Sequence, residues 1–181
     1  EVTPDGPVVR SVDVAPTLGP LLDRVARGEV QVVAVDMPVG LAVDRPRAAD
    51  RAARAALGPR RASVFPAPVR AVLEAADHAD AVARSRAACG AGIPVQAWHL
   101  VPKIREVDDY LRGSQRARDM LFEAHPEVVF RGLAGGPMSA NKKTRDGFTE
   151  RMTILKIFES DAETWIASAF LAHGGFEAVR D

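Results

Sequence analysis

Two acidic side chains lie at the ends of apolar segments that are typical of buried strands. Asp36 follows V-Q-V-V-A-V, residues 30–35, and Glu123 lies within D-M-L-F-E-A-H, residues 119–125. If the two segments are neighbouring parallel strands, both carboxylates lie at the same edge of the sheet, where ligands bind in α/β proteins. Paired carboxylates could hold Mg²⁺ or Mn²⁺ and support metal-dependent cleavage of a phosphodiester. The alternative for Asp36 is a cap for the turn before Pro38.

A histidine and several basic side chains could complete such a site. His125 follows Glu123 by two residues, and the pKa of an imidazole, close to neutrality, suits a general base. The alternative is a buried histidine bonded to a backbone carbonyl. Arg47 and Arg51 recur at helical spacing in the most basic stretch of the chain, residues 44–70. They could contact phosphates or simply form a solvated helix face.

Two further groups of charged residues are candidates for substrate binding. One lies in the polar loop 139–144 and just beyond it, where phosphate contact competes with simple solvation of the lysines. The other lies on the helix predicted after Pro102, where contact with a substrate competes with ion pairs between neighbours. The residues are Lys142, Lys143 and Arg151 in the first group and Lys103, Glu106 and Asp108 in the second.

The elements that would position these residues are those of an α/β protein. A turn signal at residues 4–7 predicts a hairpin over residues 1–14, and a helix and the strand 30–35 follow it. Residues 45–113 are predicted to form a helical insertion between the two strands that carry Asp36 and Glu123.

Within this insertion, Pro102 is expected to interrupt the helix, because proline lacks an amide donor. After Pro102, the helical spacing of Ile104, Val107 and Leu111 predicts a buried face, and Asp108 is expected nearer the other side. Two more amphipathic helices are predicted over residues 148–158 and 161–172.

Composition restricts the class of partner. The 181 residues suit a single domain, 1–181, and the 24 basic side chains balance the 24 acidic ones, so the formal net charge is zero. Nucleic acid would therefore have to be held by a local patch and not by a global field. The single cysteine, Cys89, excludes an intramolecular disulfide and fits a cytoplasmic location. No apolar run is long enough to span a bilayer, and the sequence leaves a homo-oligomer open.

Several of these segments are motifs that occur in a fixed order. They are V-D-M-P-V-G-L, S-V-F-P-A-P, P-K-I-R-E-V-D, E-A-H-P-E-V-V-F and K-K-T, followed by the G-x-x-x-R of residues 147–151. Together they resemble the DUF429 family, a group of predicted nucleases with a ribonuclease H-like fold. The resemblance extends from about Val33 to Arg151.

This resemblance implies a fold and a set of site residues. The fold would be a mixed five-stranded sheet flanked by helices, with the helical insertion after the fourth strand and a first strand preceding Glu1. Asp36 matches the fourth-strand acid of the family, and Asp181 resembles the opening residue of its C-terminal acidic motif. Glu123 and His125 match the E-x-H-P-E motif. The expected metal ligands are then Asp36, Glu123 and Asp181, with His125 as a further catalytic residue.

The leading functional hypothesis is a metal-dependent nuclease that hydrolyses phosphodiesters of nucleic acid. A nucleotide-binding phosphotransferase of the actin-like and sugar-kinase type is a second class, because those proteins share the same core. A binding module without catalysis is a third class, because the resemblance implies that part of the active site is missing from these residues.

Overall fold

Helices make up most of the structure, a computed structural model that describes residues 2–3, 6–7 and 15–172. The chain divides into two compact units, which are described separately. One unit comprises Thr17–Val129, and the other comprises Glu1–Pro16 together with Phe130–Asp181.

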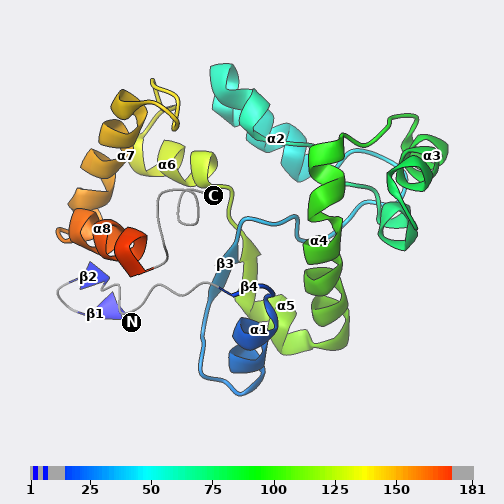
Figure 1. Ribbon diagram of the computed structural model, residues 1–181, viewed down its shortest axis with the longest axis horizontal. Helices are drawn as coiled ribbons and strands as arrows, with labels where there is room; N and C mark the ends of the chain where they lie inside the picture. Colours follow the sequence, from blue (N-terminus) through cyan, green and yellow to red (C-terminus); the bar gives the residue numbers. More distant parts are fainter. Residues whose placement is uncertain (1, 4–5, 8–14, 173–181) are drawn as a thin grey trace. The chain divides into compact units, whose positions relative to one another are not determined.

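The sheet of the Thr17–Val129 unit consists of two short parallel strands. β3, Val33–Val35, pairs with β4, Leu121–Glu123, in a register that places Val33 beside Leu121 and Val35 beside Glu123 (Figure 1). The two strands were predicted from the sequence, although both are shorter than expected. The prediction of a five-stranded ribonuclease H-like sheet was wrong, because the described residues of this unit contain only this pair.

β4 is shorter than predicted because the residues before it are helical. Residues 119 and 120, predicted as strand, belong to the helix α5, Gln115–Met120. The side chain of Ser114 accepts a hydrogen bond of 3.2 Å from the amide of Ala117 and so caps the first turn of this helix. A local cap and good helix formers therefore leave only residues 121–123 for the strand.

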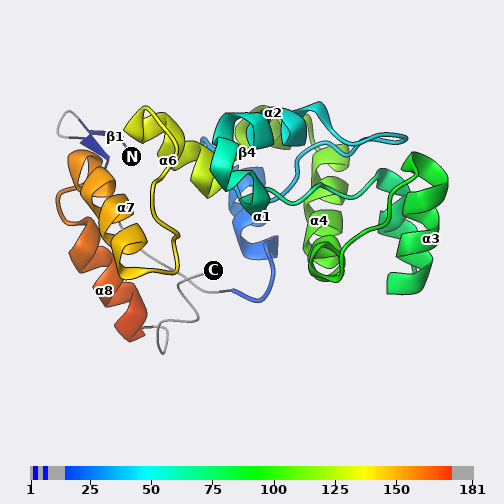
Figure 2. The ribbon, with the colours of Figure 1, turned by 90° about the horizontal axis from the view of Figure 1, so that it is seen from above.

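The centre of the unit is α4, Val95–Gly113, which lies between α1, Gly19–Ala26, and α3, His78–Cys89 (Figures 1 and 2). Its apolar residues contribute to two buried clusters. Val101 and Ile104 pack in one cluster, whereas Val107 and Leu111 pack in the other with residues of α1 and β3. The remaining helices of the segment 45–113 are α2, Ala48–Leu57, and the 3₁₀ helices η1, Gly58–Ser63, and η2, Arg70–Glu74.

The other unit contains a short hairpin and helices. The hairpin pairs β1, Val2–Thr3, with β2, Gly6–Pro7, in antiparallel fashion, whereas the rest of the predicted hairpin arms lies outside the described residues. Its helices are α7, Arg145–Phe158, and α8, Ala162–Ala172, and the boundary between the units falls within α6, Pro126–Ala134. None of the helices that the structure describes is both long and apolar enough to cross a bilayer.

Candidate functional site

The parallel pairing of β3 and β4 brings the two strand-end acids to the same end of the sheet. Glu123 is the register partner of Val35, and Asp36 is the residue that follows Val35. Asp36 is exposed, and the side chain of Glu123 keeps 31% of its surface accessible. The edge at which the sequence predicted a site therefore exists, although the sheet that forms it has two strands.

Glu123 is held by a buried arginine. Both terminal nitrogens of Arg47 donate to its carboxylate, each at 2.7 Å, and form a bidentate ion pair. The backbone amide of Val39 donates to the same carboxylate at 3.0 Å, and Nη1 of Arg47 donates to the carbonyl of Val39, also at 3.0 Å. Hydrogen bonds through Glu123 and Arg47 therefore hold the loop after β3 against the end of β4.

Asp50 is the second carboxylate on Arg47. Its Oδ1 accepts from Nε of Arg47 at 3.1 Å and from Nη2 at 2.5 Å, and its Oδ2 accepts from the amide of Ala67 at 2.8 Å. Every N–H of the Arg47 guanidinium therefore has a partner within the chain. Burial alone would lower the pKa of Arg47, but the hydrogen bonds and charges of Glu123 and Asp50 outweigh it and raise the pKa. Arg47 was predicted to contact a phosphate, and the structure places it in this internal network.

The strand-end acids do not form a donor set that fits a resident Mg²⁺ or Mn²⁺. Both oxygens of Glu123 already accept hydrogen bonds from Arg47, a cation that it shares with Asp50. Within residues 2–3, 6–7 and 15–172, no group of three or more histidine, cysteine, aspartate or glutamate side chains is placed to hold a metal ion. Asp181, the expected third ligand, lies outside the described residues.

His125 has a defined tautomer and a buried nitrogen. Its Nε2 lies 3.0 Å from the carbonyl oxygen of Ser63, so Nε2 carries the proton and donates it to that oxygen. Nδ1 is then a lone-pair acceptor; it is buried and receives no hydrogen bond from the described part of the chain. This contact with a backbone carbonyl is the alternative interpretation of His125 given in the sequence analysis. Nδ1 has no hydrogen-bond partner in the described residues, so it could still accept a proton as a general base.

A pocket of about 280 Å³ lies in the same unit. Its walls come from the loop after β3, the start of η2, the C-terminal half of α4 and one residue of α5. Arg70 donates to the Asp108 carboxylate at 2.6 and 2.9 Å, and these hydrogen bonds raise the pKa of Arg70. Because three arginines face one aspartate, the pocket has an excess of positive charge. The lining residues are Val39, Gly40, Arg70, Asp108, Leu111, Arg112 and Arg118.

The three guanidinium groups of the pocket differ in how they are used. Arg70 is paired with Asp108, and Arg118 donates to the side chain of Gln115 and to the carbonyl of Leu111. Arg112 is exposed and makes no hydrogen bond or ion pair through its guanidinium with the described residues. An anion that enters this pocket would therefore find Arg112 available.

The remaining candidates of this unit lie apart from one another. Arg51 is exposed and donates to the carbonyl of Pro46 at 2.8 Å. Lys103 is exposed on α4 and Glu106 is half-buried, and neither of them lines the pocket. Of the three residues predicted from the P-K-I-R-E-V-D motif, only Asp108 is placed at a concave surface.

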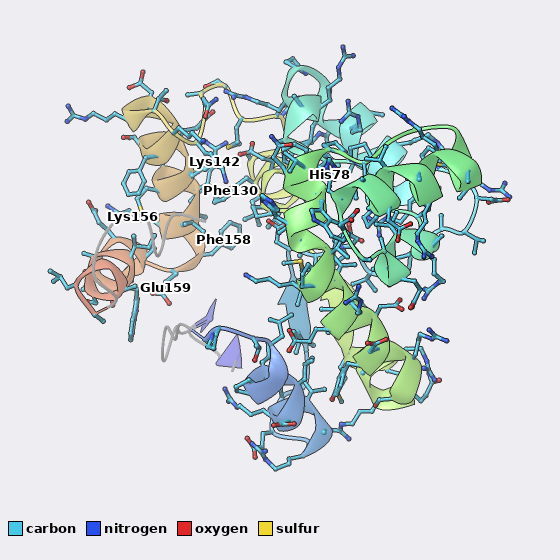
Figure 3. All side chains as sticks on the ribbon, turned by 45° about the vertical axis from the view of Figure 1, so that its right-hand side comes forward. His78, Phe130, Lys142, Lys156, Phe158 and Glu159 are labelled. Carbon is cyan, nitrogen blue, oxygen red and sulfur yellow. The ribbon has the colours of Figure 1, made fainter. Side chains whose placement is uncertain are left out.

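The predicted basic loop of the other unit is fixed by its own hydrogen bonds. The Glu150 carboxylate accepts from the amides of Ser139 and Ala140 at 2.7 and 3.0 Å, and these bonds lower its pKa to about 2. Arg151 is buried; it donates to the carbonyls of Ala140 and Gly147 and lies 5.6 Å from the ring centroid of Phe130. Figure 3 labels Phe130 and Lys142. Lys142 and Lys143 are exposed on this loop.

The comparison with protein families agrees with the motifs. The model of a family described as a protein of unknown function, DUF429, matches residues 7–176. The chain belongs to the DUF429 family. No curated protein and no solved structure matches it.

Sequence reasoning missed four residues that matter in this DUF429 chain. They are Asp50 in the Arg47 network and Arg70, Arg112 and Arg118 in the pocket. The spacing of Arg47 and Asp50, three residues apart at the start of a helix, was a signal for an ion pair. The three pocket arginines come from different elements, and no spacing in the sequence relates Arg70 to Asp108.

Proposed function

We propose that this DUF429 chain is a nuclease that hydrolyses phosphodiester bonds of nucleic acid at the end of the β3–β4 pair. The observation that carries the proposal is the parallel register, because it places Asp36 directly after the residue that pairs with Glu123. The pocket with excess positive charge is lined in part by Val39, three residues after Asp36, and suits a phosphate. The order of the motifs, which resembles that of predicted nucleases, also supports it.

The two acids would have different roles in this proposal. Asp36 is exposed and would accept the proton of the water molecule that attacks phosphorus while the ester bond breaks. Glu123 is bound to Arg47 and to the amide of Val39, so it would hold the loop after β3 in place. His125, with Nδ1 as acceptor, is the other candidate base.

The test is a cleavage assay on single-stranded and duplex RNA and DNA with Mg²⁺, with Mn²⁺ or with a chelator. Asp36→Asn is expected to lower the rate by about 100-fold or more, which is the usual contribution of a general base. Asp44→Asn is the matched control, because Asp44 is exposed and is bonded to its neighbour Arg45. Cleavage that persists in Asp36→Asn would contradict the proposed role of Asp36.

A binding module without catalysis is the second candidate. The observation that favours it is the occupation of both Glu123 oxygens by Arg47, which leaves Asp36 without a second available carboxylate from β4. If the parent protein binds nucleic acid and cleaves none of the substrates under any of the metal conditions, this candidate replaces the first.

A further inference from the structure

Arg112 differs from the other arginines around the strand ends in the use of its donors. Arg47 has a partner for every N–H, Arg70 is paired with Asp108, and Arg118 binds Gln115 and a backbone carbonyl. Arg112 lines the same pocket as Arg70 and Arg118, yet its guanidinium makes no hydrogen bond or ion pair with the described residues. A planar fork of donors of this kind matches the oxygens of a phosphate.

The surroundings of Arg112 have the shape and charge that a small anion needs. The volume of about 280 Å³ lies just below the range of roughly 300–1,000 Å³ for small-molecule sites. The buried carboxylate of Asp108, 8% exposed, balances Arg70 and fixes its guanidinium at the pocket wall. Arg112 and Arg118 then remain as the uncompensated charges, which favours one phosphate group over a neutral or cationic ligand.

The pocket is connected to the strand ends through its wall. Val39 lines the pocket, and its amide donates to Glu123 at the end of β4. The backbone amide of Arg70 donates to the carbonyl of Ala42 at 2.8 Å, so the arginine wall is bonded to the same loop. A phosphate in the pocket would therefore lie against the loop that begins at Asp36.

We propose that the pocket between the Val39–Gly40 loop and α4 is a phosphate subsite in which Arg112 binds the oxygens of one substrate phosphate. This inference rests on the proposed nuclease function for the source of the phosphate, a nucleic acid strand. Arg70, held by Asp108, is the second donor, and the apolar side chains of Val39 and Leu111 leave room for part of a sugar. The subsite positions the strand and takes no part in proton transfer.

Binding is tested with the full parent chain, because none of the three probes contains a phosphodiester bond that the proposed nuclease could cleave. Inorganic phosphate, thymidine 5′-monophosphate and unphosphorylated thymidine are titrated while the backbone amide signals of Gly40, Leu111 and Arg112 are followed by NMR. Both phosphate-bearing probes are expected to shift these signals and thymidine is not. Tighter binding of the nucleotide than of inorganic phosphate would identify a nucleotide phosphate, and not free phosphate, as the source; equal binding would identify free phosphate and overturn the assignment to a strand.

The deciding variant is Arg112→Ala in the parent chain. It is expected to weaken binding of the nucleotide by about tenfold or more, the effect of losing a charge-assisted hydrogen bond. The affinity of Arg112→Lys for the nucleotide is expected to lie between that of the protein with Arg112 and that of Arg112→Ala, because lysine keeps the charge and lacks the planar set of donors. The control is Arg86→Ala on α3, which removes the same charge at an exposed position outside the pocket and is expected to change affinity by less than about twofold.

Two outcomes separate the subsite from the nuclease proposal. Nucleotide binding that Arg112→Ala leaves unchanged overturns the subsite, whether or not the parent protein cleaves nucleic acid. Binding that depends on Arg112, in a protein without nuclease activity, supports the subsite and overturns only the proposed reaction. Because Arg112 is exposed and its guanidinium has no partner among the described residues, its replacement is expected to leave the fold intact.

Discussion

Arg47 and Arg151 are both buried arginines, one at the start of α2 and the other in the middle of α7, but they connect very different stretches of the chain. Arg47 joins Asp50, three residues away, to Glu123, which is 76 residues away, and to the loop after β3. Arg151 donates to Gly147 and to Ala140, four and 11 residues away. The first network holds distant segments of its unit together, whereas the second organises one loop against the helix that follows it.

The comparison of the two arginines indicates which basic residues are able to contact a ligand. In both regions the sequence predicted a phosphate-binding role for the arginine, and in both the arginine is at most 9% exposed and bonded within the chain. Other basic side chains remain exposed, among them Arg112 in one unit and Lys142 and Lys143 in the other. A buried arginine therefore shapes the surface, and its exposed neighbours are the ones able to contact a phosphate.

The largest expected change in the free energy of unfolding is at Arg47. Replacement by alanine leaves the Asp50 carboxylate buried without its guanidinium partner, and breaking a buried ion pair in this way costs about 3–5 kcal/mol of unfolding free energy. Urea unfolding of Arg47→Ala measures this loss. Arg51→Ala, one turn further along α2, removes an exposed arginine and is expected to change stability by less than about 0.5 kcal/mol. Equal effects of the two variants would refute the structural role of the network.

An intermediate loss of unfolding free energy is expected at Gly147, where the loop before α7 leaves no space for a side chain. A Cβ at this position would lie 1.9 Å from the backbone carbonyl oxygen of Asn141, so the loop must shift, at a cost of about 1–3 kcal/mol. Urea unfolding of Gly147→Ala measures this loss, and NMR is expected to show movement of the amides of Ser139 and Ala140. The control is Gly132→Ala in α6, where a Cβ meets nothing within 4 Å and a more stable helix is expected. A shared loss in both variants would contradict this account.

The smallest effect is expected at Glu150 and depends on pH. Two backbone amides lower its pKa from 4.5 to about 2, so the carboxylate contributes its full stabilisation above about pH 4.5 and loses it as the pH falls toward 2. NMR titration of the Glu150 side chain measures this pKa directly. Glu150→Gln is expected to remove that part of the acid dependence of stability. A titration midpoint near 4.5 in the folded protein would show that the carboxylate does not hold the loop.

Local signals in the sequence predicted individual elements well. Asp77 caps α3 through a 2.8 Å hydrogen bond from the amide of Asp80, and Gly90 ends that helix at a φ of 76°; aspartate and glycine are residue types that favour these two positions. The buried face of α4 was also confirmed, since Ile104 and Val107 are at most 1% exposed. These features depend on residues a few positions apart, which is the range over which capping and helical periodicity act.

Predictions that needed tertiary information were less successful. α4 continues through Pro102, which was expected to interrupt it, because packing of its apolar face on both sides of Pro102 stabilises the helix as a whole. Asp108 was expected nearer to solvent, and it is buried because Arg70, 38 residues earlier, brings it a charge partner. The strand extent and the number of strands were likewise outside the reach of local patterns.

The sequence by itself determined the family and the two strand segments that carry Asp36 and Glu123, because each of these is encoded by neighbouring residues. Only the tertiary structure decided that Glu123 is bound to Arg47 and that the guanidinium of Arg112 has no partner in the described residues. The reason is physical: whether a charged side chain is neutralised depends on groups brought close in space from distant parts of the chain, and no local spacing specifies that.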